Sequence, residues 1–492
     1  MPGHRNGRGI SPVETWDFII VGAGPAGLSL AAGLVAAGRS RILVLDTGQR
    51  TLPPGQQAVR PHVLEFDQWL AAGCDGWAPE DVLPHFKAVE SDGDFGDPAL
   101  RGRAGQLPLR RTEETGWGRI DHAFHIAALE QGHPWAPNHN SPGALGVSPL
   151  ARAADDSGEV RVADVLGAAL AGGSVTLKRA GMIGQLVWDG TRAAGVTARV
   201  DGAWRTIRSQ EVVLCAGAVG TAVILQRSGV GPPDLLRRAG IAPVVESPVG
   251  IGLQTHPRMM VAAQGGPPER THAFGMMARW NTGLELTASG DMMAWTVSPP
   301  LDRDPGWDLQ PPPGTGALLV GALAQVFSRG KVAVRTSDPG IEPEVDAALL
   351  SDPVDRLRSR LLYRHLSDLI SRPHLRDLLG PVTDEDGRAW DFRMTDSEVD
   401  RWAQSCFRPA QHYSSTCRMG RADNPVAVVD PECRVCGTQG LRVADSSIFP
   451  SIVRADPWLT EAVIGRRAAE LITLSKKPSG LLASKQTTEI LR

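Results

Sequence analysis

The chain begins with two apolar runs that a glycine-rich turn separates. Residues 18–21 are continuously apolar, as in a buried parallel strand, and residues 41–46 repeat the pattern and end on Asp46. The turn is Gly22-Ala-Gly-Pro-Ala-Gly27, and the small and apolar residues of a helix start follow it. This order predicts a strand, a tight turn, a helix and a second strand.

Each glycine of this turn has a separate physical role in holding a dinucleotide. Gly22 permits a sharp bend, Gly24 lets the backbone approach a pyrophosphate, and Gly27 lets the helix pack close to the strand. The free N–H groups and the positive end of the helix dipole attract the phosphates. Asp46 stands nineteen residues after Gly27, where its carboxylate accepts hydrogen bonds from ribose hydroxyls. We therefore predict a dinucleotide site at this turn.

Later apolar segments predict further parts of the same domain. Residues 211–215 form an apolar strand that leads into a helix over 221–228. Alternating segments at 174–177 and 183–188 predict two more strands. Far along the chain, residues 440–445 repeat the strand pattern before a long helix that includes Ile464 to Ile472. The predicted dinucleotide domain is therefore discontinuous.

The segment from Arg258 to about Arg408 has a different composition. It contains a proline-rich stretch over 298–316 and helical periodicity over 354–369. It is also rich in methionine and tryptophan, at Met276, Met277, Trp280, Met292, Met293 and Trp295. These side chains fit an apolar substrate pocket, and they fit an ordinary core equally well. We interpret the segment as an inserted domain with a sheet and helices.

Composition and charge narrow the class of protein. The chain has 492 residues and a net charge of −3, so it has no basic surface for nucleic acid. The polar stretch Met1 to Glu14 does not resemble a signal peptide, and the absence of long apolar runs argues against stable membrane insertion. The pair Cys433 and Cys436 lacks partners at zinc spacing, so we predict no metal site. These features favour a cytoplasmic protein.

Four blocks of sequence in a fixed order carry a resemblance to a known family. They are the glycine turn; residues 67–87; residues 217–232 with 249–257; and residues 412–420 with 429–431 and 440–447. Together they resemble the glucose–methanol–choline (GMC) family of FAD-dependent oxidoreductases. The resemblance implies an α/β fold, in which a discontinuous Rossmann-like FAD-binding domain carries an inserted α+β substrate domain.

The resemblance also implies domain limits. The FAD-binding domain is expected over 14–257 and 409–475, and the substrate-binding domain over 258–408. Residues 476–492 are expected to form a flexible tail.

FAD is the cofactor that the resemblance implies, and oxidation of an alcohol is the reaction. Hydride would pass to flavin N5 while a base removes the hydroxyl proton, and His412 matches the family's catalytic histidine. The substrate would be a small molecule, apolar or aromatic if the methionines and tryptophans line its pocket. The electron acceptor does not follow from the sequence. The expected cofactor-binding residues are Gly22, Gly24, Pro25, Ala26, Gly27, Asp46, Ile183, Ala216, Gly217, Asp445 and Ser446.

The sequence departs from the family pattern at three places. Between Gly48 and Asp67 it lacks the GGSS motif, whose backbone donors hold the flavin pyrophosphate; Val59 and Arg60 resemble the remnant of the strand that follows it. At the partner position of the catalytic histidine stands Trp458, whose indole N–H donates but cannot accept, and we expect it in the catalytic site. Asp456 replaces an asparagine there, and Thr255 replaces the usual aspartate.

These departures leave three hypotheses open. The chain is a flavoenzyme in which His412 works with a different partner. Alternatively, it is a divergent relative with weak or no flavin, which catalyses a non-redox cyclisation or elimination or binds a small molecule. The third hypothesis is a nonfunctional copy that lost the loop by deletion.

Overall fold

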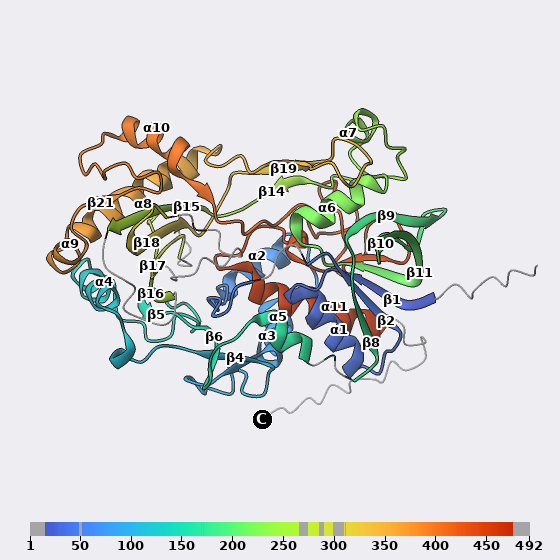
Figure 1. Ribbon diagram of the computed structural model, residues 1–492, viewed down its shortest axis with the longest axis horizontal. Coiled ribbons are helices and arrows are strands. Elements are labelled where there is room, and N and C mark those ends of the chain that lie inside the picture. The colour runs from blue at the N-terminus through green and yellow to red at the C-terminus, as the bar shows by residue number, and fades with distance from the viewer. Residues whose placement is uncertain are drawn as a thin grey trace, which may run out of the picture.

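Two seven-stranded sheets organise the chain. The computed structural model describes residues 15–48, 52–168, 170, 172–264, 274–284, 290–298, 309 and 311–475. The N-terminal stretch before Thr15, the expected tail from residue 476 and most of the proline-rich 298–316 stretch lie outside the described residues. Figure 1 shows the first sheet with α1 and α11 on one side of the molecule, and the second sheet with α4, α8 and α9 on the other.

The first sheet is the predicted dinucleotide-binding sheet. Its strands are, in spatial order, β8 (Val175–Arg179), β2 (Ile42–Asp46), β1 (Thr15–Val21), β11 (Ala203–Leu214), β10 (Arg192–Val200) and β9 (Met182–Asp189), with β23 (Leu441–Val443) beside β11. Strand β1 runs parallel to β2 and β11, and β23 is parallel to β11. The continuous apolar runs are buried on both faces, as expected for parallel strands. The strands predicted from the apolar and alternating segments are confirmed.

Two helices from opposite ends of the chain cover this sheet together. Helix α1 (Pro25–Ala36) follows the glycine turn, and α11 (Pro457–Ser475) packs on it. A Cβ atom at Gly465 would lie 2.0 Å from the Ala26 carbonyl oxygen, so the two backbones are in direct contact. Helix α6 (Gly217–Arg227) follows β11. The discontinuous α/β domain is thus confirmed.

The second sheet is antiparallel. Its order is β21 (Val382–Thr383), β15 (Pro257–Gln264), β18 (Thr315–Leu323), β17 (Met292–Val297), β16 (Phe274–Trp280) and β5 (Gly146–Pro149), with β22 (Arg408–Pro409) beside β15. Helices α4 (Arg119–Glu130), α8 (Pro353–Ser371), α9 (Pro373–Leu379) and α10 (Asp396–Cys406) cover one face of it. Helix α8 confirms the helical periodicity predicted for 354–369.

The second sheet is not built from one inserted segment. Strand β5 and helix α4 both precede residue 258. Even so, β5 pairs with β16 and α4 packs beside α9. The expected boundary between residues 257 and 258 therefore needs correction, because edge pairing and helix packing recruit residues 119–149 to this side of the molecule. Sequence periodicity identified elements but not the sheet that each one joins.

The remaining elements are short. The helices are α2 (Val63–Ala71), α3 (Pro79–Val89), α5 (Val162–Ala168) and α7 (Pro233–Arg238), with 3₁₀ turns η1 (Glu114–Gly116) and η2 (Ser446–Ile448). A four-stranded sheet holds β3 (Glu90–Asp92), β4 (Leu107–Arg110), β6 (Arg152–Asp155) and β7 (Gly158–Glu159). The others are β12 (Val230–Gly231), β13 (Val245–Glu246), β14 (Ile251–Leu253), β19 (Gly330–Ala333) and β20 (Glu344–Asp346).

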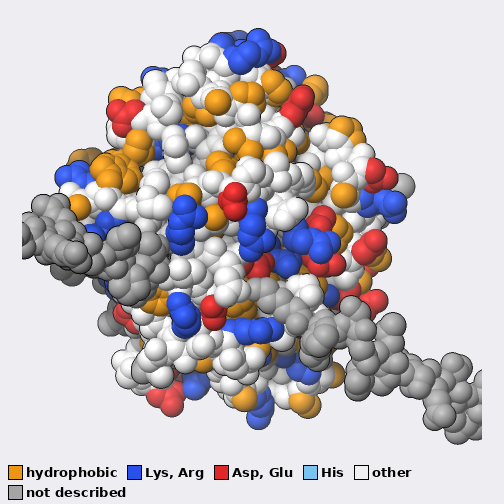
Figure 2. Space-filling model, turned by 90° about the vertical axis from the view of Figure 1, so that its right-hand side faces the viewer, with side chains coloured by type: hydrophobic (Ala, Val, Ile, Leu, Met, Phe, Trp, Pro, Cys, Tyr) orange, Lys and Arg blue, Asp and Glu red, His pale blue; other side chains and the backbone are white. Residues whose placement is uncertain are grey.

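The surface carries charges of both signs. On the face seen in Figure 2, Lys and Arg side chains lie among Asp, Glu and hydrophobic side chains. Over the described ranges, no helix is long and apolar enough to cross a bilayer.

Candidate functional site

The glycine turn forms a cradle at the N-terminus of α1. A Cβ atom at Gly22 would lie 2.1 Å from the Cys215 carbonyl oxygen, and one at Gly27 would lie 2.0 Å from the Gly22 carbonyl oxygen. Both positions therefore need glycine for packing. At Gly24, by contrast, a Cβ would meet no protein atom within 4 Å. The turn keeps open space beside the helix N-terminus, where backbone N–H groups and the helix dipole favour an anionic pyrophosphate.

Residues on both sides of Gly24 support this cradle. Pro25 occupies the first turn of α1, where its missing N–H costs no helical hydrogen bond, and both Pro25 and Ala26 are buried. Across the sheet, Gly217 begins α6 with φ of 74°, and a Cβ there would also meet no atom within 4 Å. Ala216 caps α6, and its N–H donates to Thr221 Oγ1 at 3.2 Å.

Asp46 ends β2 beside the cradle. Its Oδ2 accepts a hydrogen bond from the Ala23 N–H at 2.7 Å, and its Oδ1 accepts one from the Gly48 N–H at 2.5 Å. The Ala180 N–H, between β8 and β9, donates to the Asp46 carbonyl oxygen at 2.8 Å. The acidic residue expected at a ribose thus lies against the glycine turn. Ile183 is buried near the start of β9, which pairs with β10 rather than with β2.

Asp445 connects three parts of the first domain. Its Oδ2 accepts hydrogen bonds from the Gly217 N–H at 2.9 Å and Thr221 Oγ1 at 2.6 Å, and its Oδ1 accepts one from the Ser447 N–H at 2.9 Å. Burial raises the pKa of the Asp445 carboxyl, and these hydrogen bonds act in the opposite direction. The carbonyl oxygen of Ser446 accepts from the Ser415 N–H at 3.1 Å. Asp445 and Ser446 therefore join the cofactor side to the segment that carries His412.

His412 lies opposite a second histidine. The chain around residues 254–258 runs antiparallel to residues 408–414: β15 pairs with β22, and the Ala410 N–H donates to the His256 carbonyl oxygen at 2.9 Å. Backbone bonds between Gln254 and Ser414 continue this ladder. The ladder places His256 Nδ1 2.8 Å from His412 Nδ1. His256 belongs to one of the four family-like blocks, but its role as a partner of His412 was missed from the sequence.

The hydrogen bonds determine which nitrogen of each ring carries a proton. His256 Nε2 lies 3.0 Å from the Val453 carbonyl oxygen, which only accepts, so Nε2 of His256 is protonated. Burial, followed by the neighbouring His412, lowers the pKa of His256 to about 3, while the carbonyls of Val453 and Ala324 oppose the shift. The neutral ring therefore offers Nδ1 as an acceptor, and His412 must donate through its own Nδ1. The Nε2 lone pair of neutral His412 is left available.

Asp456, rather than Trp458, faces that lone-pair position. His412 Nε2 lies 3.7 Å from Asp456 Oδ2, and Asp456 is 4% exposed. Trp458 Nε1 instead donates to the Gln57 carbonyl oxygen at 2.7 Å. The indole N–H at the start of α11 is thus directed to residues 52–62, and the place of Trp458 in the catalytic site stays a prediction. Gln56 Nε2 donates to Asp456 Oδ2 at 2.7 Å from the same segment.

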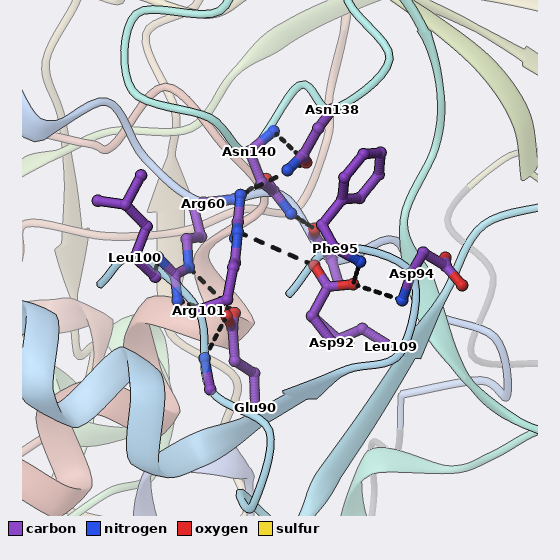
Figure 3. A network of polar contacts seen from close by, with 12 residues as sticks. Arg60, Glu90, Asp92, Asp94, Phe95, Leu100, Arg101, Leu109, Asn138 and Asn140 are labelled. Atoms are coloured by element: carbon purple, nitrogen blue, oxygen red, sulfur yellow. Dashed lines mark hydrogen bonds and ion pairs between the residues drawn. The ribbon is translucent and has the colours of Figure 1, made fainter. Parts of the chain in front are cut away.

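An ion-pair network anchors residues 52–62 (Figure 3). Arg60 donates to both carboxylate oxygens of Glu90, at 3.0 Å and 2.5 Å, and to the Leu100 carbonyl oxygen at 2.8 Å. The Arg60 N–H donates to Asn140 Oδ1 at 2.7 Å. The Arg60 and Glu90 side chains are 9% and 0% exposed. The segment that brings Gln56 and Gln57 to α11 is therefore held by buried charges at its other end.

The two faces of the second sheet have different surroundings. Met276 and Met292 pack with the covering helices, whereas Met277, Met293 and Trp295 join the core shared with the first domain. The alternation follows from the strand period of two. Of the methionines and tryptophans noted in the sequence, these three lie on the face of the sheet that packs with the first domain. Trp280 stacks on His365 instead, with ring centroids 4.0 Å apart.

The cysteine pair forms no recognisable metal site. Cys433 is buried and Cys436 is partly exposed, and burial raises the pKa of the Cys433 thiol to about 12. Cys433 lies in a bend and Cys436 in a turn. Within the described ranges, no group of three or more His, Cys, Asp or Glu side chains is placed to hold a metal ion.

Comparisons with known proteins identify the family. Two family models, both described as GMC oxidoreductase, match residues 51–258 and residues 326–465. The chain belongs to the GMC oxidoreductase family. It is 27% identical to an oxygen-dependent choline dehydrogenase of Brucella canis, over 93% of this chain and 95% of that protein. Family membership and the open cradle at Gly24 both support FAD as the cofactor.

Solved structures share the fold. A pyridoxine 4-oxidase from Mesorbium loti superposes with a TM-score of 0.80 at 23% identity, covering 93% of this chain and 99% of that one. A fungal aryl-alcohol oxidase superposes with a TM-score of 0.76 at 18% identity, covering 94% and 99%. These likenesses show that the chain shares the fold of the two oxidases.

Proposed function

We propose that this GMC oxidoreductase oxidises an alcohol, with His412 as the general base. The observation that carries the proposal is the hydrogen-bond chain from Val453 through His256 to His412, which leaves His412 Nε2 unprotonated in the neutral ring. A histidine in this state can accept a hydroxyl proton near neutral pH. His412 is partly exposed, at 16% of its side chain, so a substrate hydroxyl can approach it.

Several residues of the site have separate roles in the proposed reaction. Gly24 and Gly217 leave the open space for the cofactor, and Asp46 stands where a ribose is expected. Bound FAD would supply the hydride acceptor. His412 would hold the substrate proton on Nε2, and the buried Asp456 carboxylate, 3.7 Å away, would stabilise the resulting imidazolium.

Two observations concern the substrate class. The relatives named above are a choline dehydrogenase, a pyridoxine oxidase and an aryl-alcohol oxidase, and each of these names refers to a substrate with a hydroxyl group. Met277, Met293 and Trp295 share the face of the second sheet that packs in one core with the first domain. Soft, adaptable apolar side chains of this kind suit apolar or aromatic alcohols. We therefore include an apolar or aromatic group in the proposed substrate.

The test is flavin reduction under anaerobic conditions. The purified protein should show bound flavin, and a panel of apolar, aromatic and amino alcohols should identify one that bleaches its absorbance. His412→Ala should slow this reduction about 10²–10⁴-fold, the usual contribution of a general base. The flavin content should stay unchanged, because His412 is not part of the glycine cradle.

His374→Ala is the matched control, since His374 is an exposed histidine of α9 that pairs with surface Glu130. It should reduce flavin at the wild-type rate. A protein that takes up no flavin would reject the proposed function in favour of the non-redox hypothesis. A His412→Ala variant that reduces flavin at the wild-type rate would instead reject His412 as the general base.

A further inference from the structure

We propose that His256 is a positioning residue, which keeps the proton of neutral His412 on Nδ1 and thereby preserves Nε2 as the base. The inference rests on the proposed function of His412 but concerns a different residue. His256 touches no reacting atom in this scheme; it acts through the ring that does.

The His256 ring makes two hydrogen bonds, and they fix its Nδ1 as an acceptor. His256 is 0% exposed, and its Nε2 is committed to the Val453 carbonyl oxygen at 3.0 Å. Its Nδ1 lies 2.8 Å from His412 Nδ1, a distance typical of a well-formed hydrogen bond. Because a neutral imidazole has one donor and one acceptor nitrogen, the Val453 bond determines the role of the other nitrogen.

The Asp456 carboxylate lies on the opposite side of His412 from His256. Asp456 Oδ2 lies 3.7 Å from His412 Nε2, and its carboxylate would accept a proton-bearing Nε2. The carboxylate alone would therefore favour the tautomer in which Nε2 carries the proton and cannot act as a base. Among the described residues, two titratable groups contact His412: His256 from the segment that precedes β15, and Asp456 from the segment that precedes α11. The acceptor at His256 opposes the pull of Asp456.

Backbone hydrogen bonds hold the segments that carry the two imidazoles. Residues on either side of the pair are joined by the β15–β22 ladder and by the backbone bonds of Gln254 with Ser414. Gln254 Oε1 also accepts from the Ile452 N–H at 3.1 Å, which holds the Val453 segment in place. The orientation of His256 is therefore set by three segments at once.

Two amide substitutions separate the two bonds of His256. In His256→Asn, the amide oxygen can take the place of Nδ1, so the acceptor for His412 is kept. In His256→Gln, the longer side chain brings its amide to the place of Nε2, so the Val453 bond is kept and the acceptor is lost. Both variants keep a polar, hydrogen-bonding side chain in the same buried position.

The direct readout is the tautomer of His412. In protein with ¹⁵N-labelled histidine, with the signal assigned by its loss in His412→Ala, wild type and His256→Asn should show a protonated Nδ1 and an unprotonated Nε2. His256→Gln should show the proton moved toward Nε2. This measurement needs no substrate, so it decides the proposal even if no alcohol reduces the flavin and the proposed function fails.

Kinetics give the second readout. In His256→Gln, the rate of flavin reduction should fall at least about 10-fold, with KM little changed. This loss of rate should be smaller than the loss in His412→Ala. The acidic limb of its rate–pH profile should move to lower pH, because the imidazolium loses an acceptor; a simple loss of folded enzyme would scale the profile without moving it. His256→Asn should stay close to wild type. A wild-type tautomer in His256→Gln, or equal losses in both variants with an unmoved profile, would overturn the proposal.

Discussion

The glycine cradle and the histidine pair need very different amounts of the chain. The cradle is a continuous stretch from Gly22 to Gly27, closed by Asp46 on the next strand through a single hydrogen bond from Ala23. The histidine pair needs residues 254–258, 408–414 and 452–456, and the 52–62 segment adds Gln56 from a fourth place. A local motif can thus persist intact while the assembled region changes. The departures from the family pattern that the sequence suggests, in residues 48–67 and at Thr255 and Asp456, would fall on the assembled region.

A bulky side chain at Gly24 tests the cradle and should have the largest effect. Gly24→Leu fills the open space beside the N-terminus of α1, so we expect loss of bound flavin with the fold retained. The measurement is flavin released by heat from the purified protein. Gly167→Leu is the control, because a Cβ there also meets no atom within 4 Å but lies in α5. Equal flavin in both variants would contradict the cradle.

Removing Arg60 tests whether the assembled region depends on its buried anchor. Arg60→Met leaves the Glu90 carboxylate buried without its bidentate partner, so the free energy of unfolding should fall by about 3–5 kcal/mol. Denaturant unfolding measures this change. Arg110→Met, which breaks an exposed pair with Asp156, should have a much smaller effect. Similar losses in the two variants would mean that the network does not hold the 52–62 segment.

Neighbouring methionines test which face of the second sheet meets the substrate. Met276→Ala and Met277→Ala should both lower the free energy of unfolding, by about 2–5 kcal/mol, since both side chains are buried. Only Met277→Ala should raise KM for an apolar alcohol, about 10-fold, because Met276 packs with the covering helices. Steady-state kinetics measure the difference. An equal rise in both variants would argue against the proposed apolar wall.

The smallest effect is expected at Trp458. Trp458→Phe removes one buried hydrogen bond to Gln57 and should lower the free energy of unfolding by about 1–3 kcal/mol, with little change in the rate of flavin reduction. Trp77→Phe is matched to it, because Trp77 Nε1 donates to the Pro431 carbonyl oxygen at 2.8 Å. A slower rate in Trp458→Phe alone would return Trp458 to the catalytic role that the sequence suggested.

Several features of the fold followed from local pattern. The strands β1, β2 and β11 and the helices α8 and α11 were predicted from apolar runs and from helical period. The placement of β5 was not, because edge pairing depends on strands far apart in sequence. The split of the methionines between two faces was open for a related reason. Period two predicts that neighbours such as Met276 and Met277 face opposite sides, but not which side packs on helices.

The sequence by itself determined the dinucleotide-binding turn and the family. Gly22, Gly24, Gly27 and Asp46 lie within one strand–turn–helix–strand unit, so covalent neighbourhood and backbone sterics decide their arrangement. Only the tertiary structure decided the partner of His412. The sequence aligned Trp458 with that position. The ladder between β15 and β22 brings His256 to His412, and the Trp458 indole N–H bonds to Gln57. Side-chain direction at such a junction depends on packing between distant segments, which no local pattern encodes.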